Sequence, residues 1–313
     1  MAGFDEMDVD TIWMDGEYVD WEDAQIHVLS HGLHYGTGIF EGVRCYDTEE
    51  RGPAIFRWED HLDRFYQSGK PYDMELPYDR EELTAATLEL IRRQELRSCY
   101  IRPIAFYGYH QLGVSPGDCP VRVAIACWPW GAYLGEDALE NGIAVKVSSW
   151  RKHASSQIPT NAKTTGLYVN SLLAGEEARR NGFREAIVLN KEGQVAEGPG
   201  ENVFLVRDGE IYTPGLSQSI LDGITRQSVI QVARDLGYTV HDDAVISRGE
   251  LNTADELFFT GTAAEVTPIS RVDNVEVGTG SRGPVTEEIQ SAFFDLVERR
   301  TDAHDDWFTY VDV

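Results

Sequence analysis

The sequence predicts a mixed α/β (α+β) chain folded as two domains. Its 313 residues exceed the size at which one hydrophobic core usually stops growing. Both halves combine strand-like alternation with amphipathic helical patterns. The aromatic segment 128–135 interrupts these patterns, so we expect the domain boundary there. The expected parts are a disordered lead-in at 1–10, a small N-terminal α/β domain at 11–129, an interdomain loop at 130–136 and a large C-terminal domain at 137–313.

The first half is expected to contain a hairpin, two helices and two long strands. Asp15 and Gly16 are typical of a two-residue hairpin turn. Strand alternation places Tyr100 and Arg102 on one face, where a phenol and a guanidinium could recognise a carboxylate. An exposed surface pair is the alternative. The expected elements are the hairpin 11–19, a glycine- and aromatic-rich loop at 31–42, a strand at 42–46, a helix beginning within 55–65, a helix at 81–96, and strands at 100–106 and 121–127.

The second half shows two places suited to an anion. A glycine turn leads into a helix at Ile224 and Thr225, and Thr260 to Thr262 offer hydroxyls and unhindered amides. Plain helix capping is the alternative for the first. The expected elements are a strand at 143–149, a helix at 168–180, a strand at 185–189, a segment at 194–206 with a Gly-Pro-Gly loop at 198–200, a helix after 219–226, an apolar strand from 256 that runs into small residues up to 265, and a helix from residue 284.

The composition argues against several classes of partner. The net charge is −26, from 53 acidic and 27 basic residues, which disfavours nucleic acid and anionic membranes. No apolar run approaches the length that spans a bilayer. The cysteines show no metal spacing and fit reduced core thiols, so we expect a cytoplasmic protein without a metal. The acidic, lysine-poor surface suggests a halophilic cytoplasm.

Lys163 differs from the other lysines in its setting. Lys152 and three others lie beside charge, glycine or in an alternating strand, as surface residues do. Small and hydroxyl residues precede Lys163, and no carboxylate is close in sequence. A lysine in such a setting can lose its proton and attack carbonyls. An ordinary lysine at a strand–helix junction is the alternative.

These features together suit pyridoxal 5'-phosphate, which requires a lysine, a phosphate site and an acid partner for its ring nitrogen. Over most of its length, about 12–294, the chain resembles the fold-type IV (class IV) pyridoxal-phosphate-dependent aminotransferases, closely the branched-chain amino acid aminotransferases. The motifs that carry the resemblance are HGLHYGTGIFEG at 31–42, YIRP at 100–103, WGAYLG at 130–135, Lys163 with Tyr168, EGPGEN at 197–202, GITR at 223–226 and TGTAAE at 260–265.

The resemblance implies a two-domain, D-amino acid aminotransferase-like fold and a role for each motif. Lys163 would be the Schiff-base lysine and proton shuttle, Glu197 the partner of the pyridine nitrogen, and Tyr168 that of the ring hydroxyl. The phosphate would be held by Arg64, Ile224, Thr225 and Thr262. The substrate would be held by Tyr35, Phe40, Trp130 and Tyr133 around its side chain, by Tyr100, Thr262 and Ala263 at its α-carboxylate, and by Arg102 at the distal carboxylate of glutamate.

The implied activity is reversible, ping-pong amino transfer between leucine, isoleucine or valine and 2-oxoglutarate, by a homodimer or larger homo-oligomer. Gly38, Leu167 and Pro199 depart from the family pattern, which affects the expected substrate ranking more than the chemistry. The alternatives are a D-amino acid aminotransferase, an aminodeoxychorismate lyase and a non-catalytic metabolite-binding protein on the same scaffold.

Overall fold

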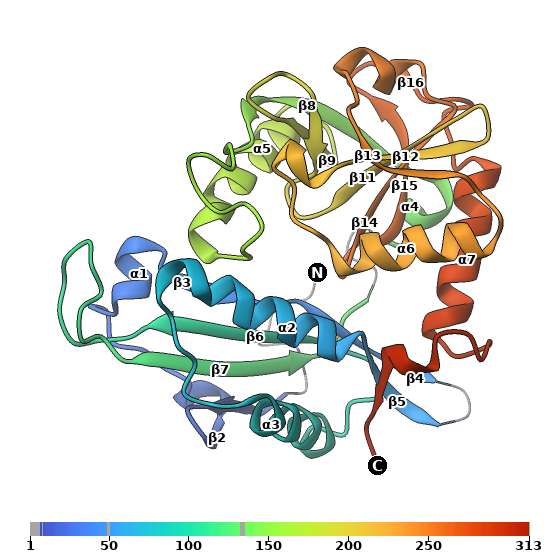
Figure 1. Cartoon of the computed structure of the whole chain (residues 1–313). Coiled ribbons are helices and arrows are strands. Elements are labelled where there is room, and N and C mark those ends of the chain that lie inside the picture. The colour runs from blue at the N-terminus through green and yellow to red at the C-terminus, as the bar shows by residue number, and fades with distance from the viewer. Residues whose placement is uncertain (1–6, 8, 49–50, 132–134, 313) are drawn as a thin grey trace. The chain divides into compact units, whose positions relative to one another are not determined.

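The computed structural model describes residues 7, 9–48, 51–131 and 135–312. The chain divides into two compact units (Figure 1). The first unit comprises Met1–Gly131, Ala162–Leu167 and Leu296–Val313, and the second comprises Ala132–Asn161 and Tyr168–Asp295. Most of the predicted lead-in and part of the predicted 130–136 loop, including Tyr133, lie outside the described residues.

The structure differs from the predicted division at two segments. We assigned Lys163 to the C-terminal domain, but its segment belongs to the first unit. The reason is backbone pairing, because the Phe40 amide donates to the Lys163 carbonyl (3.1 Å) and Ile39 forms a β-bridge with Thr164. The chain's last residues also belong to the first unit, where β17 (Phe308–Tyr310) pairs with β5 (Gly52–Phe56).

The first unit is built on one sheet with the strand order β17-β5-β4-β6-β7-β1-β2, to which β3 adds by pairing with β6. The sheet pairs are antiparallel; a short turn joins β1 to β2, and few residues separate β4 from β5. In the predicted hairpin Trp13 faces Tyr18, and the turn residues Asp15 and Gly16 both have positive φ. The remaining strands are β1 (Thr11–Met14), β2 (Glu17–Asp20), β3 (Gly38–Phe40), β4 (Val43–Thr48), β6 (Cys99–Tyr107) and β7 (Val121–Trp128).

Two helices cover one face of this sheet. Leu62 and Phe65 of α2 (Trp58–Gly69) and Leu90 of α3 (Arg80–Arg93) share a core cluster with the odd-numbered residues of β6 and β7. Strand alternation turns the even-numbered residues to the opposite face. Tyr100 and Arg102 therefore point away from this core. A short helix, α1 (His31–Tyr35), completes the unit.

The second unit has a mixed sheet with the order β10-β9-β8-β15-β14-β11-β12-β13, and β16 pairs with β15. The β8–β9, β8–β15 and β12–β13 pairs are parallel. The strands are β8 (Ile143–Arg151), β9 (Glu185–Leu189), β10 (Val195–Glu197), β11 (Asn202–Arg207), β12 (Glu210–Pro214), β13 (Val240–Ala244), β14 (Glu256–Gly261), β15 (Glu265–Val272) and β16 (Val275–Glu276).

Helices flank this second sheet. In Figure 1, α5 (Tyr168–Arg180) lies beside β8 and β9, where its Ala174 and Ala178 pack on Ala186 and Val188. Contacts with β13 and β14 hold α6 (Ile224–Asp235). The other helices are α4 (Glu136–Asn141) and α7 (Pro284–Val297). Within the described residues, no helix combines the length and apolarity needed to cross a membrane.

Most predicted elements are confirmed with small shifts in their ends. The main exception is the helix expected to begin within 55–65, because Ile55 and Phe56 belong to β5 and α2 begins at Trp58. Pairing of β5 with both β4 and β17 outweighs the local helical pattern. The loop at 31–42 contains both α1 and β3.

Candidate functional site

Lys163 lies in the first unit at the edge of β3. Its backbone amide donates to Ser68 Oγ (2.9 Å), and its Nζ lies 5.1 Å from the centre of the Phe40 ring. Burial, together with repulsion from Arg64 and Arg102, lowers the pKa of the Lys163 ammonium to about 8, although Glu41 and Tyr100 oppose the shift. The amine is therefore much easier to deprotonate than an ordinary lysine.

Arg64 approaches Lys163 as one member of a buried ion-pair network. Its Nε and Nη2 donate to the two oxygens of Glu41 (2.7 and 2.8 Å), and His61 Nδ1 donates to the same carboxylate (2.7 Å). Burial acts to raise the pKa of Glu41, but Arg64 and His61 outweigh it and hold that pKa well below its usual range. Burial lowers the pKa of His61, against the opposing effect of Glu41.

Glu41 and His61 were not among the predicted site residues. A signal for His61 was present, because it is three residues before Arg64 on one helix and so shares its face. Glu41 gave no such signal, since 23 positions separate it from Arg64. Two of the guanidinium nitrogens of the predicted phosphate ligand Arg64 are thus engaged by a protein carboxylate.

Tyr100 and Arg102 lie together on the face predicted from strand alternation. Arg102 Nη2 donates to the Tyr100 hydroxyl (3.1 Å), and the guanidinium carbon lies 4.9 Å from the centre of the Phe40 ring. Within the described part of the chain, the buried Arg102 Nε has no hydrogen-bond partner. A buried donor without an acceptor is costly, so this position suits a ligand that brings an anionic oxygen.

The apolar residues predicted around the substrate are only partly gathered here. Trp130 packs on Tyr100 with ring centroids 5.1 Å apart, and the Phe40 ring is close to both Lys163 and Arg102. Tyr35 is exposed by 44% on α1, where it contacts His31. Gly42 leaves the room that the Tyr100 ring occupies, because a Cβ at this position would overlap the phenol oxygen.

In the second unit, Glu197 is a buried carboxylate held on both oxygens. Its Oε2 accepts from Asn202 Nδ2 (3.1 Å) and from the Leu221 amide (3.0 Å), and its Oε1 pairs with the Lys152 ammonium. The expectation that Lys152 is a surface residue is wrong. Its amide donates to the Leu189 carbonyl, which continues the pairing of β8 with β9 and directs this side chain to Glu197.

The predicted anion sites of the second unit border Glu197. Ile224 and Thr225 begin α6, and the cap residue Gly223 contributes no side-chain hydrogen bond to the first helical amides. Gly223 packs directly on Asn202, which also donates to the Leu221 carbonyl (3.0 Å). The carboxylate and the start of α6 are therefore joined through one amide side chain.

The remaining predicted residues of the second unit occupy two of its turns. Thr262 and Ala263 are partly exposed in the turn between β14 and β15. That turn adjoins the loop after Glu197, since a Cβ at Gly261 would contact the Gly200 carbonyl. Tyr168 is the first residue of α5 and is partly buried.

Known proteins are similar to this chain in both architecture and sequence. The family model for amino-transferase class IV matches residues 38–272. The branched-chain-amino-acid aminotransferase of Pseudomonas aeruginosa (strain PAO1) is 50% identical over 300 residues, which cover 96% of this chain and 97% of the relative. The crystal structure of the Escherichia coli branched-chain amino acid aminotransferase superimposes with a TM-score of 0.94 at 48% identity, covering 97% of this chain and 100% of that one.

A second solved structure carries the cofactor. The branched-chain amino acid aminotransferase from Thermobaculum terrenum, in its pyridoxal-phosphate holo-form, gives a TM-score of 0.92 at 34% identity, and it covers 98% of this chain and 100% of its own. With the family model matching well over half of the residues, the chain belongs to the class IV aminotransferase family.

Proposed function

We infer that the protein is a branched-chain-amino-acid aminotransferase that uses pyridoxal 5'-phosphate to transfer the amino group between leucine, isoleucine or valine and 2-oxoglutarate. Relatives of this activity match nearly the whole chain at 48–50% identity. The observation that carries the assignment in the chain itself is Lys163, whose pKa is lowered to about 8 beside the buried Arg102 donor. The D-amino acid aminotransferase, lyase and non-catalytic alternatives are not favoured.

When bound, pyridoxal phosphate supplies an aldehyde that condenses with amines and a ring that withdraws electrons from the carbon next to the nitrogen. Lys163 would attach the group through its neutral amine and later carry a proton to and from the substrate α-carbon. Glu197, which pairs with Lys152, would hold the protonated ring nitrogen. Tyr168 would hold the ring hydroxyl, and the proposed phosphate ligands are Arg64, Ile224, Thr225 and Thr262.

The proposed substrate site combines apolar walls with polar ends. Phe40 and Trp130, with Tyr35 and Tyr133, would surround the aliphatic side chain. Tyr100, Thr262 and Ala263 would hold the α-carboxylate, and Arg102 the distal carboxylate of glutamate. The Arg102 Nε without a partner supports the last role, because a second carboxylate would satisfy it. One site would thus serve both leucine and glutamate in a ping-pong cycle.

Visible absorption of the purified protein with pyridoxal phosphate tests the assignment. A yellow protein whose spectrum changes to that of the pyridoxamine form on addition of L-leucine is the expected result. A spectrum that ignores leucine but responds to D-alanine would support the D-amino acid enzyme instead. A Lys163→Ala protein is expected to show neither the imine band nor turnover.

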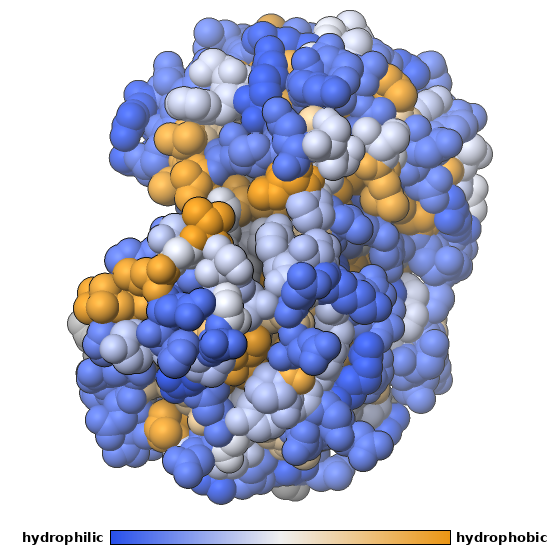
Figure 2. Space-filling view, turned by 60° about the vertical axis from the view of Figure 1, so that its left-hand side comes forward, coloured by the Kyte–Doolittle hydropathy of each residue, from blue (hydrophilic) through white to orange (hydrophobic). Residues whose placement is uncertain are grey.

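The proposal includes a homodimer or larger homo-oligomer. Val28, Leu33 and Val114 are exposed by 67%, 61% and 88%, on α1 and two loops of the first unit. Figure 2 shows apolar residues gathered in clusters on one face of the molecule. His31 links α1 to the loop that carries Val114, through the Gly113 carbonyl (2.8 Å). Leu33 on α1 and Val114 therefore belong to one surface. A second copy of the chain is the occupant we propose, because contiguous exposed apolar area marks interaction sites.

Light scattering on a size-exclusion column measures the oligomer. Leu33→Asp is expected to shift the protein to a smaller species, because a carboxylate in an apolar interface loses its hydration. The matched control is Val275→Asp, an equally apolar exposed residue on β16. A parent protein that elutes as a monomer would contradict the proposal. We also propose a cytoplasmic setting, which the four free and buried cysteines support.

A further inference from the structure

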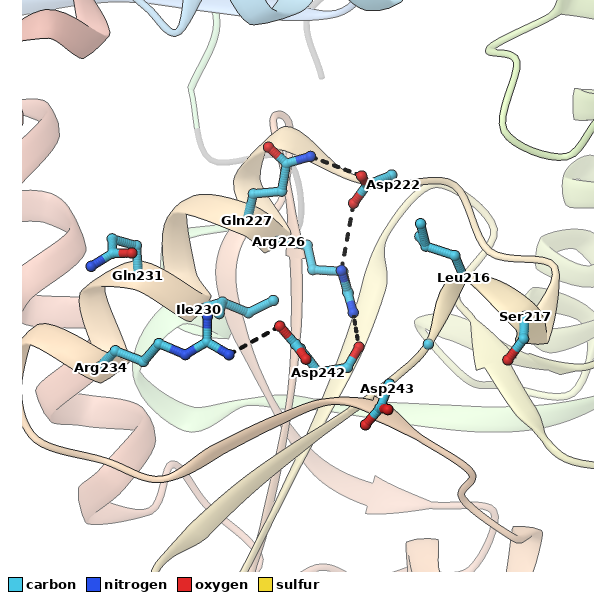
Figure 3. Close-up of a pocket in the computed structure, with 11 residues that line it drawn as sticks. Leu216, Ser217, Asp222, Arg226, Gln227, Ile230, Gln231, Arg234, Asp242 and Asp243 are labelled. Atoms are coloured by element: carbon cyan, nitrogen blue, oxygen red, sulfur yellow. Dashed lines mark hydrogen bonds and ion pairs between the residues drawn. The ribbon is translucent and has the colours of Figure 1, made fainter.

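Arg226 is a buried arginine whose guanidinium donates hydrogen bonds to other groups of the protein. Its side chain is 5% exposed, and it follows Ile224 and Thr225 in the first turn of α6. In Figure 3 its guanidinium points from α6 to Asp222 and Asp242. Nη2 donates to the carbonyls of Pro214 (3.1 Å) and Asp242, Nε donates to Thr213 Oγ1 (3.3 Å), and Nη1 lies 3.5 Å from an Asp222 oxygen.

The two carbonyls that accept from Arg226 lie where the pairing of two strands is irregular. The parallel ladder of β12 and β13 shifts register between Tyr212 and Pro214. Proline has no amide hydrogen, so the regular ladder cannot continue through this position. Carbonyls at such a break need another donor when they are buried. The guanidinium supplies it, and so joins the break in the sheet to the first turn of α6.

The first turn of α6 has no capping side chain, although Gly223 packs on Asn202. Its cap residue is Gly223, which gives no side-chain hydrogen bond to the helical amides. The hydroxyl of Thr213 that meets Arg226 donates in turn to the Val203 carbonyl (2.9 Å) on β11. Arg226 therefore helps to set the direction of the Ile224 and Thr225 amides, because it holds the turn to β11, β12 and β13.

We propose that Arg226 is a positioning residue for the cofactor phosphate, acting through the Ile224 and Thr225 amides that it anchors. This inference rests on the proposed phosphate site. Arg226 itself is not expected to touch the phosphate, because its hydrogen bonds go to two carbonyls and a hydroxyl of the protein. Its buried positive charge also lies at the end of α6 where the helix dipole favours an anion.

The chain offers a matched control on the same helix. Arg234 lies two turns later and pairs with the side chain of Asp242 (3.0 Å), whereas Arg226 takes the carbonyl of that residue. Both residues carry one positive charge and both contact β13. Arg234 is about half exposed, so its replacement removes a similar charge without loosening the first turn.

The test compares the affinities of the full-length apo-protein for pyridoxal phosphate and for pyridoxal, measured by fluorescence titration. Both ligands present the same aldehyde to Lys163, so the ratio of the two dissociation constants isolates the phosphate. We expect the parent to prefer the phosphate ester by at least about a hundredfold. Arg226→Gln and Arg226→Lys should each reduce that preference about tenfold, and Arg234→Gln should change it less than about twofold.

Each outcome decides between the possibilities. If both Arg226 variants weaken the two ligands equally, or leave both unchanged, while the parent retains its preference, the positioning role is overturned and the phosphate site stands. A parent that binds both ligands with equal affinity overturns the proposed phosphate site, and the inference with it. Arg226→Lys retains the charge but not the forked geometry, so it serves where Arg226→Gln does not fold.

Discussion

At the scale of single residues, the properties of Lys163 come from groups distant in sequence. Burial lowers its pKa most, and Arg64, 99 positions earlier, adds repulsion. Glu41 limits this lowering of the pKa, because its negative charge favours the Lys163 ammonium and because its carboxylate pairs with Arg64. The sequence indicated a lysine without carboxylates close in sequence, but only the fold brings Arg64 and Glu41, with their opposite effects on the pKa, near Lys163.

Arg102 is predicted to discriminate between the two kinds of substrate. Arg102→Ala should lower kcat/KM for glutamate about a hundredfold, because a charge-assisted contact of about 2–3 kcal/mol is lost. Leucine, which has no distal carboxylate, should lose less than about fivefold. Steady-state kinetics with each amino acid measures this. Arg122→Ala, which breaks an ion pair with Asp15 on the same sheet, is the control. Equal losses of kcat/KM for glutamate and leucine would contradict the proposed role of Arg102.

Glu185 is predicted to make stability depend on pH. Burial raises the pKa of its carboxyl to about 7, against the opposing effects of the Ala186 amide and Arg184. The folded state therefore keeps this proton at pH values where the unfolded chain has lost it. The contribution of Glu185 to stability is therefore fully present below the ordinary glutamate pKa of 4.5 and is lost as the pH rises through about 7.

Glu185→Gln removes this titration. The variant should unfold at a higher temperature than the parent at pH 8, and the difference should shrink as the pH falls below about 5. Thermal melts across this range measure the effect. Glu192→Gln, which makes the same change at an exposed position, serves as the control. A constant difference between Glu185→Gln and parent at all pH values would contradict the assignment.

At the scale of elements, α3 shows which local signals are reliable. Asp79 accepts from the Glu82 amide (2.9 Å), and the Glu82 side chain accepts from the Asp79 amide (2.7 Å), forming a capping box. These contacts span three residues, so the sequence alone suffices to fix where this helix begins. The start of α2 depends instead on β5, which pairs with β17 near the far end of the chain.

The cap of α3 is predicted to contribute about 1 kcal/mol to the free energy of unfolding. Asp79→Ala should lose this amount because the Glu82 amide loses its acceptor. Asp79→Asn retains a capping oxygen and should lose much less. Urea denaturation at neutral pH compares the three proteins. A loss in Asp79→Asn as large as that in Asp79→Ala would show that charge, rather than capping, is responsible.

At the scale of the whole molecule, the net charge of −26 predicts a dependence on salt. At low ionic strength the carboxylates repel one another over about 30 Å, and about 1 M salt shortens that range to about 3 Å. The unfolding temperature should therefore rise between dilute buffer and about 2 M KCl. Sucrose at matched osmolality is the control, since it stabilises proteins without screening charge. Equal unfolding temperatures in dilute buffer and KCl would argue against halophilic adaptation.

The sequence by itself determined those features that depend on neighbouring residues. The Asp15–Gly16 turn, the common face of Tyr100 and Arg102, and helix α5 follow from spacings of a few positions, and the ordered motifs identified the family. Conformational preferences and side-chain periodicity act over such short distances.

The tertiary structure alone decided which charges meet. It placed Lys163 with the first unit, paired Glu41 with Arg64, and turned Lys152 from an expected surface residue into the partner of Glu197. Ion pairs between residues 23 or 45 positions apart leave no periodic trace in the sequence. They form because the sheet brings the two side chains together and burial removes the water that would otherwise separate them.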